Sequence, residues 1–108
     1  MLKKSQRLTR VAFMDCFSKG KRIHATYSTS IISPATILQC AVVVGKKVSK
    51  KAVTRNTLRR SAYGVIERLV KERPVQGMFI FVLKPTVAGI SRAALQTALE
   101  AEFGRVLN

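Results

Sequence analysis

Two short apolar runs constrain the fold more than any other feature of this chain. AVVV at residues 41–44 and MFIFVL at 78–83 do not alternate with polar residues, so each is typical of a strand buried on both faces. Neither run approaches the roughly 20 apolar residues that a membrane-spanning helix needs. Apolar residues recur at helical spacing between the two runs, at Leu58, Ala62, Val65 and Leu69. We therefore expect one sheet with helices packed on it.

Three helices are expected, over residues 9–18, from 51 or 52 to 72, and over 92–107. Thr9, Ser49 and Ser91 carry the side-chain oxygens that can cap their first turns. Pro74 is expected to stop the second helix because proline cannot continue a helical hydrogen-bond ladder.

Three segments have the composition of strands. Residues 22–33 are rich in β-branched and aromatic types and predict one strand, and residues 36–45 predict a second. These two are expected to pair as a hairpin across the turn at 33–35, with 78–83 as the third strand. The order predicts a single α+β domain over 1–108, an α-β-β-α-β-α sandwich with a small mixed sheet of about three to four strands.

The charge is strongly positive and unevenly placed. The net charge is +15, and ten Lys or Arg lie between Cys16 and Glu67 without an acid among them. Such a field attracts a polyanion, either nucleic acid or an anionic membrane surface. A membrane-surface helix would set large apolar residues opposite several lysines, but the last predicted helix carries only Arg92 and Arg105 as cations. Nucleic acid is the favoured partner, with no role at a membrane.

Groups suited to catalysis or to metal binding are missing from the pattern. The five acids fall on predicted helices at spacings typical of solvated faces, and His24 has no nucleophile in a recognisable context. Cys16 and Cys40 lie far apart without a CxxC partner, so we expect reduced, half-buried thiols and no metal site. With no export signal recognisable, these features predict a cytoplasmic protein.

The segment KKVSKKAVTRNTLRR, residues 46–60, carries seven cations and no acid where the long helix is expected to begin. Cations there repel one another and the positive end of the helix dipole. A solvated helix face would interleave both signs, so the segment instead predicts a surface for a phosphate backbone, of DNA or of RNA. On a helical wheel of 100° per residue, Arg55, Asn56, Arg59, Arg60 and Tyr63 share one arc.

The same segment carries a family resemblance. KKVSKKAVTRN followed by TLRR resembles the signature of the protein subunit of bacterial ribonuclease P, and RLTRVAFMDCFSKGKR at 7–22 resembles the opening of that family. The resemblance covers residues 2–107 and implies a left-handed crossover between the strands that flank the long helix. Two positions depart from the family pattern, because Thr57 replaces an arginine and Tyr63 stands where a basic residue is frequent.

The resemblance implies a subunit of an endoribonuclease that removes the 5′ leader of precursor tRNA. In that family the RNA subunit holds Mg²⁺ and performs the chemistry, and the protein contributes no catalytic residue. The implied contacts with ribonuclease P RNA are Lys46, Lys47, Lys50, Lys51, Arg55, Asn56, Arg59 and Arg60. The alternative is a ribosomal or other structural RNA-binding protein, which usually adds long basic tails.

A cleft between the sheet and the first helix is implied as the binding site of the precursor leader. Its expected residues are Phe13, Phe17, Lys19, Lys21, Arg22 and Tyr27. Phenylalanines four residues apart on a short helix are also typical of a core, and a packed Tyr27 fits the sequence equally well.

Overall fold

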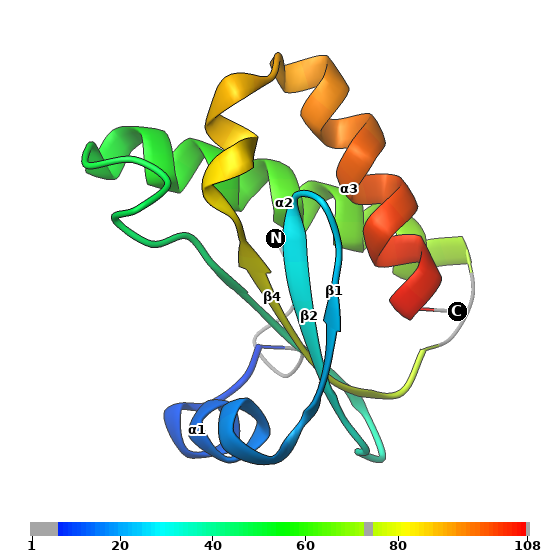
Figure 1. Cartoon of the computed structure of the whole chain (residues 1–108). Helices are drawn as coiled ribbons and strands as arrows, with labels where there is room; N and C mark the ends of the chain where they lie inside the picture. Colours follow the sequence, from blue (N-terminus) through cyan, green and yellow to red (C-terminus); the bar gives the residue numbers. More distant parts are fainter. Residues whose placement is uncertain (1–6, 73–74, 108) are drawn as a thin grey trace.

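One four-stranded mixed sheet organises the chain, with helices on both of its faces (Figure 1). The computed structural model describes residues 7–72 and 75–107, so Pro74, expected to stop the second helix, lies outside the described residues. In chain order the elements are α1 (Arg10–Lys19), β1 (Lys21–His24), β2 (Ser28–Ser33), β3 (Leu38–Val43), α2 (Ala52–Glu72), β4 (Gly77–Leu83), the 3₁₀ helix η2 (Pro85–Gly89) and α3 (Arg92–Val106).

The predicted helices are confirmed, and two of the predicted caps are present. The Thr9 hydroxyl accepts a hydrogen bond from the backbone N–H of Ala12 at 3.2 Å, which begins α1. Ser91 does the same for the N–H of Ala94, also at 3.2 Å, at the start of α3. Both helices therefore begin where a side-chain oxygen can satisfy a free N–H group.

The strand β4 lies inside the sheet, whose order is β1-β2-β4-β3. It pairs antiparallel with β2 and parallel with β3. The predicted hairpin between residues 22–33 and 36–45 is therefore wrong, because β4 lies between these two segments. The mixed α+β sheet is confirmed, and the parallel pair requires the crossover through α2. The left-handed course of that crossover stays a prediction.

The start of β4 shows how it fits between its neighbours. Gly77 has φ +131°, a region that favours glycine, and its N–H donates to the carbonyl of Ile37 at 3.2 Å. A β-carbon there would approach the ring of Phe79 at 3.2 Å and the carbonyl of Ser33 at 3.4 Å. The chain that leaves β2 thus passes the end of β4 before it enters β3.

The segment predicted as one strand over 22–33 is itself a hairpin of β1 and β2. Its turn, residues 25–27, lacks Gly, Asn and Pro and is held by residues distant in sequence. The carbonyls of Ala25, Thr26 and Tyr27 accept hydrogen bonds from Lys84 Nζ, Thr86 Oγ1 and the Lys84 N–H, respectively. These long-range bonds explain why the local pattern of β-branched residues did not reveal the turn.

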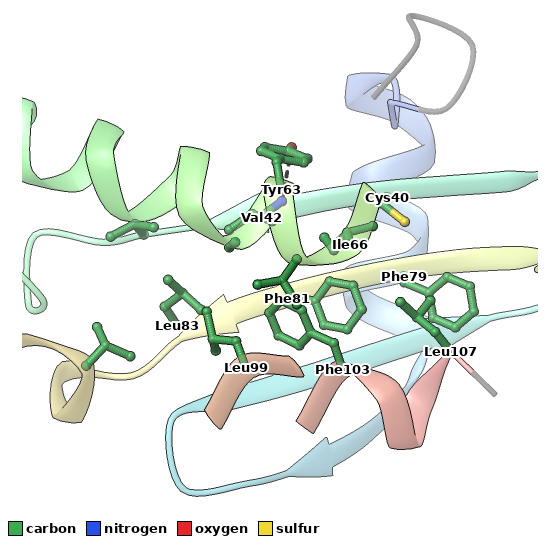
Figure 2. Packing of buried hydrophobic residues seen from close by; sticks show 14 of the residues in the cluster. Cys40, Val42, Tyr63, Ile66, Phe79, Phe81, Leu83, Leu99, Phe103 and Leu107 are labelled. Atoms are coloured by element: carbon green, nitrogen blue, oxygen red, sulfur yellow. Dashed lines mark hydrogen bonds between the residues drawn. The ribbon is translucent and has the colours of Figure 1, made fainter. Parts of the chain in front are cut away.

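The two faces of the sheet are covered by different helices (Figures 1 and 2). The larger core lies under α2 and α3, where the rings of Phe81 and Phe103 stack with centroids 4.1 Å apart. On the opposite face, α1 covers Ile31 and Ile80 with its fully buried Cys16. Side chains alternate between these faces along each strand, which assigns every strand residue to one side.

Both cysteines are free and fully buried rather than half-buried. Burial raises the pKa of the Cys40 thiol to about 12. The thiol therefore stays protonated and unreactive at neutral pH in the folded chain.

Glu102 on α3 should contribute measurably to stability because it binds the β1–β2 turn. Its carboxylate accepts hydrogen bonds from Ser28 Oγ at 2.7 Å and from the N–H of Tyr27 at 3.1 Å. We expect Glu102→Ala to lower the free energy of unfolding by about 1–3 kcal/mol, measured by urea denaturation. Glu100→Ala removes the same charge from an exposed position of the same helix and should change it by less than about 0.5 kcal/mol. Equal losses would contradict the role given to Glu102.

Candidate nucleic-acid interface

The basic surface consists of the eight residues predicted to contact a phosphate backbone. It occupies the loop after β3 and the first turns of α2. Val48 is buried in the larger core, and its N–H donates to the carbonyl of Gly45 at 3.1 Å. This anchor fixes the middle of the loop, while Lys46, Lys47, Lys50 and Lys51 are exposed. The four lysines are therefore exposed on a loop that Val48 anchors to the core.

Arg55 joins the loop to the helix. Its Nη1 donates to the carbonyls of Ser49 at 2.9 Å and Lys50 at 3.0 Å. The Ser49 hydroxyl accepts from the N–H of Lys51 at 3.2 Å, one residue before the helix, so Ser49 orders the approach rather than capping α2 itself. One edge of the Arg55 guanidinium is therefore used within the protein, and its remaining N–H groups are available to a ligand.

Asn56 and Arg59 are oriented by each other. Arg59 Nη1 donates to Asn56 Oδ1 at 2.8 Å. Because a guanidinium only donates, the amide oxygen must face it, and the Asn56 NH₂ group is left as a donor. Thr57, which departs from the family pattern, donates its hydroxyl to the carbonyl of Val53 at 3.0 Å and is exposed.

A pocket of about 280 Å³ opens on this face of α2. Of the residues that the structure describes, Asn56, Arg59, Arg60 and Tyr63 line it, and none of them is an acid. Tyr63 is only 9% exposed, and its hydroxyl accepts a hydrogen bond from the N–H of Val42 at 3.2 Å (Figure 2). The helical wheel already placed Tyr63 beside the arginines, but nothing in the sequence signalled its bond to β3.

A larger hollow, of about 590 Å³, lies between the β1–β2 turn and α3. Its walls include Tyr27, Glu102 and Arg105. Both oxygens of Glu102 already accept hydrogen bonds, from the N–H of Tyr27 and from Ser28 Oγ, and its charge disfavours a polyanion there. The smaller pocket is the better match to an anionic partner.

Phe13, Phe17 and Arg22 lie together on the α1 side of the sheet. The two rings stack with centroids 5.8 Å apart, and Phe13 packs on the core beneath α1. Phe17 is 40% exposed, and the Arg22 guanidinium lies 4.7 Å from the centroid of its ring while donating to its carbonyl at 2.8 Å. The core interpretation therefore applies to Phe13, whereas Phe17 and Arg22 present an aromatic ring and a cation to solvent.

The other three residues predicted for the leader cleft do not join this group. Lys19 pairs with Asp15 at 3.2 Å on the exposed side of α1. Lys21 alternates with Arg22 and so points to the opposite face of the sheet. Tyr27 packs against the larger core under α2 and α3. The structure thus divides the six residues between two faces of the sheet, and their contact with a leader stays a prediction.

Residues 7–72 and 75–107 contain neither a metal-binding cluster nor a membrane-spanning helix. This part of the chain holds no group of three or more His, Cys, Asp or Glu side chains able to bind a metal ion. It also holds no helix whose length and apolar content would let it cross a membrane.

Comparisons with known proteins agree with the sequence signature. The family described as Ribonuclease P matches residues 2–107. The ribonuclease P protein component of Pseudanabaena sp. (strain PCC 6903) is 38% identical over 92 residues, which cover 82% of this chain and 78% of that protein. The RNase P protein from Thermotoga maritima has a similar fold, with a TM-score of 0.79 at 20% identity over 92% of this chain and 96% of that one. The RNase P protein from Staphylococcus aureus has a TM-score of 0.77 at 18% identity, over 100% of this chain and 96% of that one.

Arg55 and Arg60 should differ in their effect on stability, although both carry one charge on the same helix. Arg55→Ala removes two hydrogen bonds that hold the loop, so we expect it to lower the free energy of unfolding by about 1–2 kcal/mol. Arg60→Ala removes an exposed cation and should stay within about 0.5 kcal/mol of wild type. Urea denaturation of both variants tests this, and an unaffected Arg55→Ala would show that the two bonds do not stabilise the loop.

Proposed function

Because this chain belongs to the ribonuclease P protein family, we propose that it binds the RNA subunit of ribonuclease P through the basic surface and assists removal of the 5′ leader from precursor tRNA. It is a protein component of a ribonuclease complex, and its partner is an RNA subunit. The proposal adds which surface holds that RNA, which surface meets the substrate, and the cytoplasm as the place of action. A purely structural RNA-binding role is not favoured by the family match.

The basic surface is the observation that carries the proposal. Residues 46–66 contain seven cations and no acid, and the structure gathers the seven at one loop and one helix start. Bound RNA phosphates would replace the repulsion among these cations by attraction and would release counterions from the RNA. Guanidinium forks and ammonium groups suit phosphate oxygens, and Asn56 adds a neutral donor.

We assign the Mg²⁺ ions of the reaction to the RNA. Mg²⁺ favours oxygen ligands such as carboxylates, and the described residues offer no cluster able to hold it. The residues that the structure describes therefore do not fit a resident Mg²⁺ site. The protein's part is to bind RNA and to screen phosphate repulsion between enzyme RNA and substrate.

For the single-stranded leader we propose the α1 side of the sheet. Phe17 offers an exposed part of its ring for base stacking, and Arg22 beside it can meet a phosphate. The sheet surface next to them is half-exposed at Thr29, Val43 and Val82, which share the face with Arg22. An unpaired strand could lie along this face, whereas the α2–α3 side is filled by the larger core.

The holoenzyme reaction tests the main proposal. Purified protein would be added to ribonuclease P RNA and precursor tRNA at low Mg²⁺, where protein cations are most needed, and leader removal would be measured. We expect wild type to stimulate cleavage and the variant Arg55, Arg59, Arg60→Ala to lose most of the stimulation. Its matched control replaces Arg10, Arg92 and Arg105, three exposed arginines outside the basic surface. The proposal fails if wild type gives no stimulation, or if the two triple variants behave alike.

The salt dependence of RNA binding gives a second readout of the same variants. The slope of log K against log salt should fall by about 0.7–0.9 for each phosphate contact removed, hence by about 2–3 for the basic-surface variant. An unchanged slope would mean that these arginines do not contact phosphates.

Phe17→Ala tests the proposed leader contact. Loss of one base stack should weaken binding of precursor tRNA to the holoenzyme by about 5- to 150-fold and leave mature tRNA unaffected. Val11→Ala is the matched control, since Val11 is 81% exposed and lies about 120° around α1 from Phe17. Equal losses for precursor and mature tRNA would assign Phe17 a packing role only.

A further inference from the structure

The hydroxyl of Tyr63 can accept one hydrogen bond and donate another, and within the described residues the structure shows only the accepted bond. It accepts a hydrogen bond from the N–H of Val42, on the outer edge of β3, at 3.2 Å (Figure 2). A phenol that accepts through its oxygen keeps its own hydrogen for donation. Tyr63 also lines the 280 Å³ pocket with Asn56, Arg59 and Arg60, so this donor belongs to a residue of the pocket wall.

All four described residues that line the pocket then offer donors. Asn56 offers its NH₂ group because its oxygen accepts from Arg59. Arg59 and Arg60 offer guanidinium N–H groups, and Tyr63 offers its O–H. Described lining that offers donors and carries two positive charges matches a group that has several acceptor oxygens and a negative charge.

We propose that this pocket takes one phosphate of the RNA backbone and that Tyr63 donates a hydrogen bond to an oxygen of that phosphate. The inference rests on the proposed function, and it adds Tyr63 to the RNA-binding residues together with the kind of group that Tyr63 contacts. It also gives a role to a position where the resemblance led us to expect a cation.

The hydrogen bond from Val42 fixes the position of the Tyr63 hydroxyl. Tyr63 is 9% exposed, so packing and the β3 edge hold its ring before any ligand arrives. The exposed lysines and Arg60 must be ordered on binding, whereas this hydroxyl is already held by its bond to Val42. The pocket thus combines two charged groups with one fixed neutral donor.

Tyr63→Phe tests the proposal because it removes only the hydroxyl. We expect the affinity for ribonuclease P RNA to fall by about 3- to 30-fold. The slope of log K against log salt should stay at the wild-type value because no charge is lost, whereas Arg60→Ala should lower it by about 0.7–0.9. Tyr27→Phe, which alters the other tyrosine on the α2–α3 core, should leave RNA affinity unchanged.

A measurement on wild type covers the case in which Tyr63→Phe folds poorly, since that variant also leaves the N–H of Val42 without its acceptor. The chain has two tyrosines, so ¹³C labelling of the ring carbon that bears the hydroxyl gives two NMR signals. Saturation with ribonuclease P RNA should shift the Tyr63 signal and leave that of Tyr27 in place. An unshifted Tyr63 signal overturns the inference.

The outcomes separate this inference from the proposed function. If the Arg55, Arg59, Arg60→Ala variant loses RNA affinity but Tyr63→Phe binds as wild type does, the basic surface stands and the role of Tyr63 is wrong. If neither variant loses affinity, the proposed function fails first.

Discussion

The central position of β4 is the constraint on which the other elements depend. Ile80 faces α1 and Phe81 faces α2 and α3, so this strand must be covered on both sides, and each set of helices supplies one cover. Its parallel pairing with β3 cannot be closed by a tight turn, so the chain must cross over the sheet through α2. That crossover begins at the carboxyl end of β3, and the basic surface lies there. The location of the cations thus follows from the burial of an apolar strand.

Local hydrogen bonds, and not neighbouring acids, offset part of the repulsion among the cations of the basic surface. Cations near a helix N-terminus are unfavourable, by about 0.3–1 kcal/mol each where exposed. Arg55 offsets part of this cost through its bonds to the carbonyls of Ser49 and Lys50, and Val48 holds the loop to the core. No acid occurs in residues 46–66 to remove the remaining repulsion. A surface that keeps its charge in this way is set to bind an anion, which is the physical basis of the proposed RNA contact.

The sequence predicted local features well and long-range ones poorly. The caps at Thr9 and Ser91 and the bounds of α2 are encoded within a few residues, and all were found where expected. The β1–β2 turn and the insertion of β4 between β2 and β3 depend on Lys84, Thr86, Glu102 and Gly77, which lie far along the chain. For the same reason the sequence did not show that the six predicted leader residues lie on two faces of the sheet. Strand alternation separates Lys21 from Arg22, and the turn carries Tyr27 to the opposite core.

Tyr63 stands where the resemblance led us to expect a cation, and the outer edge of β3 gives a physical reason for a tyrosine there. The N–H of Val42 points away from β4 and needs an acceptor. On the same outer edge of β3, the carbonyl of Cys40 accepts a hydrogen bond from the N–H of Leu8 at 3.3 Å. An ammonium or guanidinium group in place of Tyr63 could only donate, so it would leave the N–H of Val42 unsatisfied or repel it. A phenol accepts from the strand with its oxygen and keeps a hydrogen for the pocket. Compared with the cation that the resemblance led us to expect, tyrosine gives up one unit of charge at the basic surface but satisfies the N–H of Val42 and keeps the donor that we propose for the phosphate.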